Sequence, residues 1–84
     1  MTSSEKILEA VMYAVEEEIE WYTLFKSKAT ALKILKAAAS EQPEEEQIAQ
    51  LIAYTEYDGL FDCYSTYDAY REVLVQLEES LLSD

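Results

Sequence analysis

Residues 40–46 of the chain read Ser-Glu-Gln-Pro-Glu-Glu-Glu, and Pro43 is the only proline among 84 residues. Proline fits the first turn of a helix, whereas the residue before it is pushed out of helical geometry. The three glutamates that follow, Glu44, Glu45 and Glu46, would lie in the first turn, where the helix dipole favours negative charge. The stretch therefore predicts that a helix begins near Pro43, almost at the middle of the chain.

The half of the chain before this break has the pattern of one amphipathic helix. Thr2 and Glu5 have the spacing of a capping box, and neither glycine nor proline occurs between Glu5 and Ser40. Residues at alternating steps of four and three form one stripe; they are Val11, Val15, Glu18, Tyr22, Phe25, Ala29 and Leu32. After Ala29 the apolar residues move to the other side, which indicates either a bend around residues 27–30 or burial on two sides.

The half of the chain after the break keeps one helical phase to its end. This continuity favours a single helix of about 40 residues, roughly 60 Å long. Gly59 lies on the inner face of that helix, where it would either permit close helix contact or mark a break at residues 58–59. We therefore expect an all-α fold: one domain, residues 1–84, built as a long antiparallel helical hairpin, with three helices as the alternative if the chain bends near 27–30 or at 58–59.

A hairpin of two helices buries only one stripe on each helix, which is thin for independent stability. A third layer of contacts would come from the first half folding back, or from a second chain. Dimerisation into a helical bundle is accordingly predicted.

The charge of the chain narrows the possible partners. Eighteen acidic residues against six basic ones give a net charge of −12. Such a surface repels phosphate backbones and anionic membranes, so neither direct nucleic-acid binding nor membrane attachment is expected. A basic protein is the expected partner. The candidate residues of this acidic partner-binding surface are Glu16, Glu17, Glu20, Glu44, Glu45, Glu46, Glu56, Asp58, Asp62 and Asp68.

Four of the six basic residues fall in one short segment, which predicts a weakly basic zone on a negative body. They are Lys26, Lys28, Lys33 and Lys36. An aromatic row of four residues recurs at steps of three and four, opposite the main apolar face of the second half. This row is Tyr54, Tyr57, Phe61 and Tyr64. The row predicts either packing on the segment around Ile34 and Ala38, or an interface with a second copy or a foreign partner.

Two single residues stand out. Glu18 falls in the middle of the first apolar stripe, where a buried carboxylate must be paired, hydrogen-bonded or protonated, unless the helix end there is less buried. Cys63 is the only cysteine, which excludes an internal disulfide and a zinc site of several cysteines. Its helical setting predicts a packed side chain. No secretory leader and no long apolar run is present, so a cytoplasmic location is expected.

Glu16, Glu17 and Glu20 form an E-E-x-x-E run, and Asp58 and Asp62 stand four residues apart. This outline resembles the all-helical nucleotide pyrophosphohydrolases of the MazG type, which hold magnesium with an E-E-x-x-E segment and a later E-x-x-D segment. The chain departs from the second segment, and it has no histidine for the usual di-iron site or catalytic triad. No catalytic, cofactor or metal site is therefore predicted.

The leading functional hypothesis is a non-enzymatic inhibitor or adaptor that binds a basic, nucleic-acid-binding protein, with imitation of DNA as one mode of binding. Eighteen acids along a hairpin of about 60 Å give one per about 3.3 Å, and a dimer would approach the one charge per about 1.7 Å of duplex DNA. In composition the chain is similar to phage-encoded anti-restriction and anti-CRISPR inhibitors. The alternatives are a structural or regulatory homodimer whose charge serves solubility, and a magnesium-dependent MazG-like hydrolase.

Overall fold

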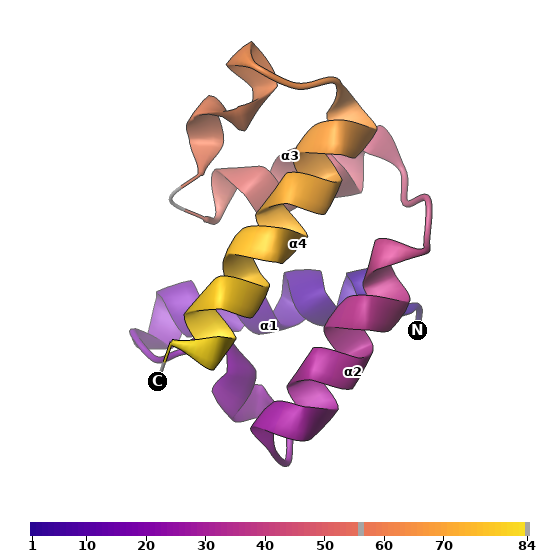
Figure 1. Ribbon diagram of the computed structural model, residues 1–84. Helices are drawn as coiled ribbons and strands as arrows, with labels where there is room; N and C mark the ends of the chain where they lie inside the picture. Colours follow the sequence, from indigo (N-terminus) through magenta and orange to yellow (C-terminus); the bar gives the residue numbers. More distant parts are fainter. Residues whose placement is uncertain (56, 84) are drawn as a thin grey trace.

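The computed structural model describes residues 1–55 and 57–83, and the described residues form helices without any strand. They comprise four α-helices, which are labelled in Figure 1, and two short 3-10 helices. In chain order these are α1 (Ser3–Glu17), η1 (Trp21–Leu24), α2 (Lys28–Ala39), α3 (Glu45–Ala53), η2 (Asp58–Asp62) and α4 (Thr66–Leu82). The all-α prediction is confirmed, but the two long helices of the expected hairpin are wrong, because each half of the chain contains two separate α-helices.

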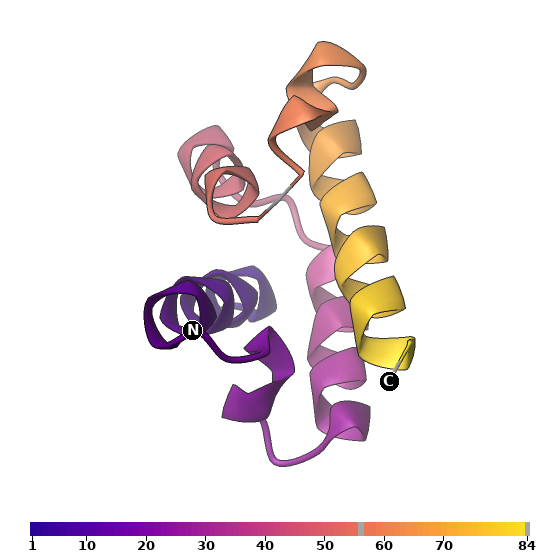
Figure 2. The same cartoon turned by 90° about the vertical axis from the view of Figure 1, so that its left-hand side faces the viewer.

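The four α-helices form two layers that cross each other. In Figure 2, α1 and α3 are seen nearly end-on and side by side, while α2 and α4 run lengthwise beside each other in the second layer. Contacts join α1 to α2 and α3 to α4 across the layers. The principal extents are 32 × 24 × 23 Å, so the molecule has half the expected 60 Å length.

The helix predicted at the proline begins close to it. Pro43 is buried, Glu44 is the N-cap residue, and α3 starts at Glu45. Glu45 and Glu46 occupy the first turn, as the charge preference of a helix N-terminus favours. The first helix also begins as predicted, because Oγ1 of Thr2 accepts a hydrogen bond from the backbone N–H of Glu5 at 3.2 Å.

The first half of the chain leaves the helical path at Glu18. This residue has a left-handed backbone (φ 57°), and the N–H of Ile19 donates to the carbonyl of Ala14 at 3.0 Å. Such a bond, from a residue just past a left-handed one, closes a helix end. Glu18 is exposed, so the prediction that it is buried in an apolar stripe is wrong. The alternative, that the helix end at Glu18 is less buried, is confirmed. The expected change of direction at residues 27–30 coincides with the start of α2, where Oγ of Ser27 accepts from the N–H of Thr30.

The second half is also interrupted, so its expected continuity is wrong. Helix α3 ends at Ala53, and α4 starts only at Thr66, with η2 between them. Gly59 is exposed, and a Cβ placed on it would meet nothing within 4 Å, so close helix contact does not require this glycine. Cys63 is exposed as well, contrary to the packed side chain predicted for it.

The core lies between the two layers and draws on all four α-helices. Its fully buried members include Ile7 of α1, Leu35 of α2, Ile48 of α3 and Val73 of α4. Tyr70 is only 1% exposed, and its hydroxyl donates to the carbonyl of Ala38 at 2.7 Å, which joins α4 to the end of α2. Burial raises the pKa of Tyr70 to about 12, with a further contribution from the negative charge of Glu41.

One acidic residue has a structural role inside the fold. The carboxylate of Glu41, in the segment before α3, accepts from the backbone N–H groups of Ser3 and Ser4 at 3.1 and 2.9 Å. It therefore caps the N-terminus of α1 from a distant part of the chain. The hydrogen bond from Ser4 lowers the pKa of Glu41 below its usual 4.5, against the opposing effect of partial burial.

Candidate protein-binding surface and pocket

The acidic residues predicted to bind a partner come from five different parts of the fold. The described side chains among them are all exposed; they are Glu16, Glu17, Glu20, Glu44, Glu45, Glu46, Asp62 and Asp68. Glu56 lies outside the described residues, and Asp58 is described only as the first residue of η2. Asp68 is engaged locally, because Oγ of Ser65 donates to it at 2.9 Å and Arg71 lies 3.5 Å away.

Two groups of predicted acidic residues lie at opposite ends of the layer formed by α1 and α3: Glu44, Glu45 and Glu46 at one end, and Glu16, Glu17 and Glu20 at the other. Glu41, just before α3, contacts the N-terminus of α1, so Glu44, Glu45 and Glu46 lie near that end. Helices α1 and α3 run in the same direction from there (Figure 1), and their C-terminal ends line a common pocket. Glu16, Glu17 and Glu20 lie at this second end. The structure therefore does not gather the predicted acidic residues into one patch.

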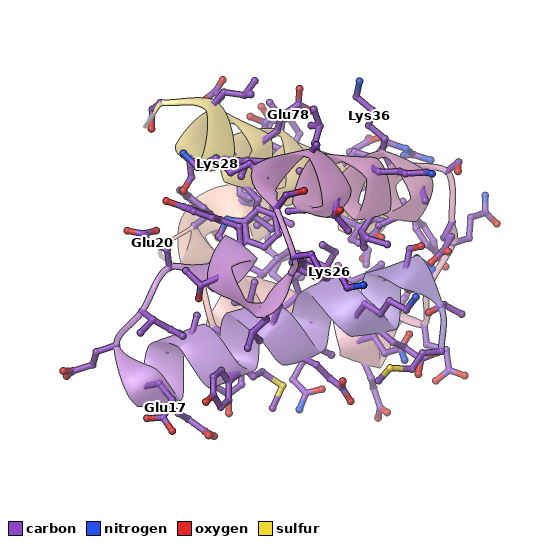
Figure 3. The ribbon with its side chains drawn as sticks, turned by 90° about the horizontal axis from the view of Figure 1, so that it is seen from below. Glu17, Glu20, Lys26, Lys28, Lys36 and Glu78 are labelled. Carbon is purple, nitrogen blue, oxygen red and sulfur yellow. The ribbon has the colours of Figure 1, made fainter. Side chains whose placement is uncertain are left out.

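The basic zone belongs to the other layer. Lys26, Lys28, Lys33 and Lys36 are exposed on α2 and on the segment that precedes it. Nζ of Lys28 lies 5.1 Å from the ring centroid of Tyr22, which is within the range of a cation–π contact. Figure 3 shows Lys36 at one edge of the molecule and Glu17 at the opposite edge. The basic zone is confined to α2 and the segment before it, because the neighbouring helix α4 carries four acidic residues and only one base, Arg71.

The aromatic row is divided, because the helix expected to carry it ends at Ala53. Tyr54 and Tyr57 are partly buried and pack against the core. Phe61 and Tyr64, in and after η2, are 43% and 44% exposed. Packing on the core thus accounts for two of the four rings, and the other two present an apolar surface to solvent.

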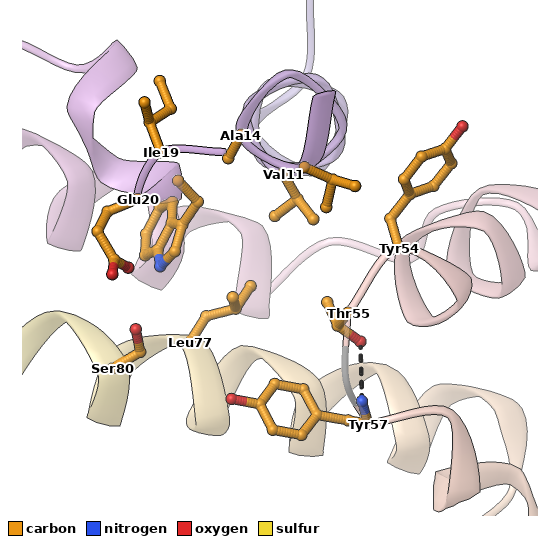
Figure 4. A pocket seen from close by; sticks show the side chains of 11 residues that line it. Val11, Ala14, Ile19, Glu20, Tyr54, Thr55, Tyr57, Leu77 and Ser80 are labelled. Carbon is orange, nitrogen blue, oxygen red and sulfur yellow. Dashed lines mark hydrogen bonds between the residues drawn. The ribbon is translucent and has the colours of Figure 1, made fainter. Parts of the chain in front are cut away.

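The C-terminal ends of α1 and α3, together with η1 and α4, surround a pocket of about 340 Å³. Figure 4 shows Val11 and Ala14 of α1 across from Leu77 of α4, with Tyr54 and Tyr57 beside them. The complete lining is Val11, Ala14, Val15, Ile19, Glu20, Trp21, Tyr54, Thr55, Tyr57, Leu77 and Ser80. Below we call this space the C-terminal pocket. Apolar and aromatic walls with a few polar groups are typical of ligand sites, and this volume is at the small end of their range.

Trp21 lines this pocket, and its indole N–H is closed off from solvent. The residue is only 5% exposed, and its Nε1–H has no hydrogen-bond partner among the described residues. The ring is held by edge contacts with Tyr22 and Phe25, whose centroids lie 6.0 and 6.1 Å away. Leaving a buried donor unpaired costs about 1–3 kcal/mol, so this N–H is a local cost to the stability of the fold.

A second hollow of about 470 Å³ lies at the N-terminus of α1, beside Thr2, Ser4 and Pro43. The backbone N–H groups of Ser3 and Ser4 that would attract an anion there already bind the carboxylate of Glu41. This hollow therefore lacks the unpaired donor that distinguishes the C-terminal pocket.

The spacing that resembles the MazG magnesium segment depends on a continuous helix from Glu16 to Glu20. The chain does not form that helix, because Glu18 turns the backbone out of it. Within residues 1–55 and 57–83, no three acidic or cysteine side chains are grouped closely enough to hold a metal ion. The acidic run is thus divided between the last turn of α1 and the segment before η1.

Sequence reasoning identified Glu20, Tyr54 and Tyr57 but did not find the C-terminal pocket that they line. Trp21 had no predicted role, and its partly apolar surroundings follow from the turn at Glu18. A glycine or proline would have signalled that turn, and residues 6–39 contain neither. The one available signal was the single tryptophan itself, whose N–H needs a partner when buried.

No protein-family model, curated protein or solved structure matches this chain. Within the part of the chain that the structure describes, no helix is both long enough and apolar enough to cross a membrane. Function is therefore inferred from the charge of the surface and from the chemistry of the pocket.

Proposed function

We propose that this protein is a non-enzymatic binding module whose acidic surface engages a basic, nucleic-acid-binding protein, in the manner of an inhibitor that imitates DNA. The density of acidic groups on a compact body supports this proposal most directly. Eighteen acidic residues over a long axis of 32 Å correspond to about one per 1.8 Å. Duplex DNA carries one charge per about 1.7 Å of its axis.

In the extended hairpin expected from the sequence, only a dimer reached the charge density of DNA. Subtracting the six basic residues gives a net charge of −12, or about one per 2.7 Å. Helices α1 and α3 together carry six acidic residues against one base, Lys6, whereas α2 carries three bases and no acid. A single copy of the chain therefore offers a face on which a basic partner could dock.

Two matched triple variants test the proposal. One replaces Glu16, Glu17 and Glu20 with glutamine, and the other replaces Glu44, Glu45 and Glu46. Both remove three exposed charges, and urea unfolding checks that each variant folds. We expect immobilised protein to capture a DNA-binding protein from a lysate of its native host, and duplex DNA to compete with that capture. At least one triple variant should lose it.

A second candidate function is a structural or regulatory homodimer, supported by the exposed rings of Phe61 and Tyr64. Exposed aromatic side chains on a small protein favour association, and their burial would offset the modest core of an 84-residue chain. Light scattering at increasing concentration would measure the mass. A dimer that becomes monomeric on Phe61→Ser and captures no other protein would favour this candidate over the first.

A further inference from the structure

We propose that the C-terminal pocket binds one apolar side chain of a basic peptide segment. The inference rests on the proposed function, since it names the chemistry by which the basic partner docks. The acidic surface supplies charge attraction, whereas the pocket supplies an anchor at a defined position.

The size and walls of the pocket fit a side chain. Its volume of about 340 Å³ is small for a nucleotide cofactor but sufficient for a leucine or phenylalanine side chain with its adjoining backbone. Val11, Ala14 and Leu77 form apolar walls, and Figure 4 shows them on facing helices. Val15 and Ile19, which also line the pocket, are 52% and 43% exposed. An incoming apolar group would remove both from water.

Trp21 provides a probe of the pocket, because it is one of the residues that line it. Nε1 of Trp21 belongs to a side chain that is only 5% exposed, and it has no acceptor among the described residues.

The charge around the pocket selects a basic segment. Glu20 lines the pocket, and Glu16 and Glu17 lie in the last turn of the helix that forms one wall. All three carboxylates are exposed, so they remain available to cationic groups on either side of an anchor. An acidic segment would meet three like charges at the same place.

Three blocked peptides test the inference: acetyl-Lys-Leu-Lys-amide, acetyl-Lys-Ser-Lys-amide and acetyl-Glu-Leu-Glu-amide. Trp21 is the only tryptophan, so its indole N–H gives a single side-chain cross-peak in a nitrogen–proton correlation spectrum. We expect the Lys-Leu-Lys peptide to shift this peak in a saturable way, with a dissociation constant on the order of millimolar, as for other ligands of this size. The other two peptides should bind at least tenfold more weakly.

A pair of variants with matched exposure tests the location. Ile19→Ser shortens a wall of the pocket, and Val75→Ser changes a residue of α4 that does not line it; the two side chains are 43% and 45% exposed. Both positions are on the surface, so both variants should fold. Ile19→Ser should weaken binding of the Lys-Leu-Lys peptide at least fivefold, whereas Val75→Ser should leave it unchanged.

Each adverse result overturns a different part of the account. If no peptide moves the indole peak, or if both serine variants behave alike, the pocket is not a binding site. If Lys-Ser-Lys binds as tightly as Lys-Leu-Lys, the anchor is wrong while the acidic surface of the proposed function stands. If Glu-Leu-Glu binds as tightly as Lys-Leu-Lys, the basic character of the segment is wrong, and the proposed function loses its support at this end of the molecule.

Discussion

Glu18 ends α1 with a left-handed backbone, at φ 57°, and its side chain is exposed. Residues other than glycine pay about 1–2 kcal/mol for this conformation. Glu18→Gly should therefore raise the free energy of unfolding, by about 0.5–1 kcal/mol after the greater freedom of glycine in the unfolded chain is subtracted. The midpoint of urea unfolding measures the change.

Glu16→Gly is the control for this substitution, because it removes the same charge from a position inside α1. Glycine within a helix costs roughly 1 kcal/mol, so this variant should be less stable than the parent. Equal effects of the two glycines would show that the backbone at Glu18 is not strained.

Tyr70 provides a second test at the scale of one side chain. Tyr70→Phe removes the hydrogen bond to Ala38 and should cost about 1 kcal/mol at neutral pH. The pKa of Tyr70 is raised from 10.0 to about 12, so folding favours the protonated phenol. This contribution is complete below pH 10 and is lost as the pH rises through 12. Stability should fall more steeply above pH 10 in the parent than in Tyr70→Phe, as measured by urea unfolding at several pH values.

At the scale of the elements, the cap of α1 by Glu41 makes an acid-dependent contribution. Glu41→Gln should lose about 1–2 kcal/mol at neutral pH, because the amide replaces a carboxylate that accepts from two backbone N–H groups. The lowered pKa of Glu41 means that its contribution is present above pH 4.5 and disappears as the pH falls through the folded-state value. The two proteins should therefore converge in stability in acid; a constant difference down to pH 2 would contradict the cap.

The sequence predicts those elements whose boundaries have a local chemical signal. Thr2 and Pro43 mark the starts of α1 and α3, because a capping side chain and a fixed backbone angle act within one turn. The end of α1 has no such signal. A glutamate there adopts a conformation that glycine favours, and η1, which follows it, packs against α1 and α2. The helical spacing of apolar residues continues past Glu18, because η1 also has apolar residues at similar spacing. This periodicity therefore does not reveal the end of α1.

The candidate site was predictable in its charges but not in its shape. The acidic residues and the lysine zone can be read from the sequence, since an exposed charge needs no particular neighbour. The C-terminal pocket combines residues from α1, η1, α4 and the segment after α3. Their meeting depends on how the layers cross, which a single sequence does not encode in any local pattern.

At the scale of the whole molecule, the excess of negative charge should make the fold sensitive to salt. A net charge of −12 on a body of 32 × 24 × 23 Å produces self-repulsion that counter-ions screen. Raising sodium chloride from about 10 to 200 mM, over which the screening length falls several-fold, should increase the free energy of unfolding. Urea unfolding at each salt concentration measures this increase, provided that the slope of the free energy of unfolding against urea stays the same. A loss of stability at the higher salt concentration would indicate that ion pairs outweigh repulsion.

Recognition of a basic partner by the acidic surface is the central claim, and capture of that partner in the presence of duplex DNA tests it most directly. The parent and the two glutamate-to-glutamine triple variants are immobilised side by side, and the bound proteins are identified by mass spectrometry. We predict that a DNA-binding protein is retained, is released by added duplex DNA, and is lost from at least one triple variant. Retention of only further copies of the chain, or of a partner that neither DNA nor loss of the carboxylates displaces, would contradict the account.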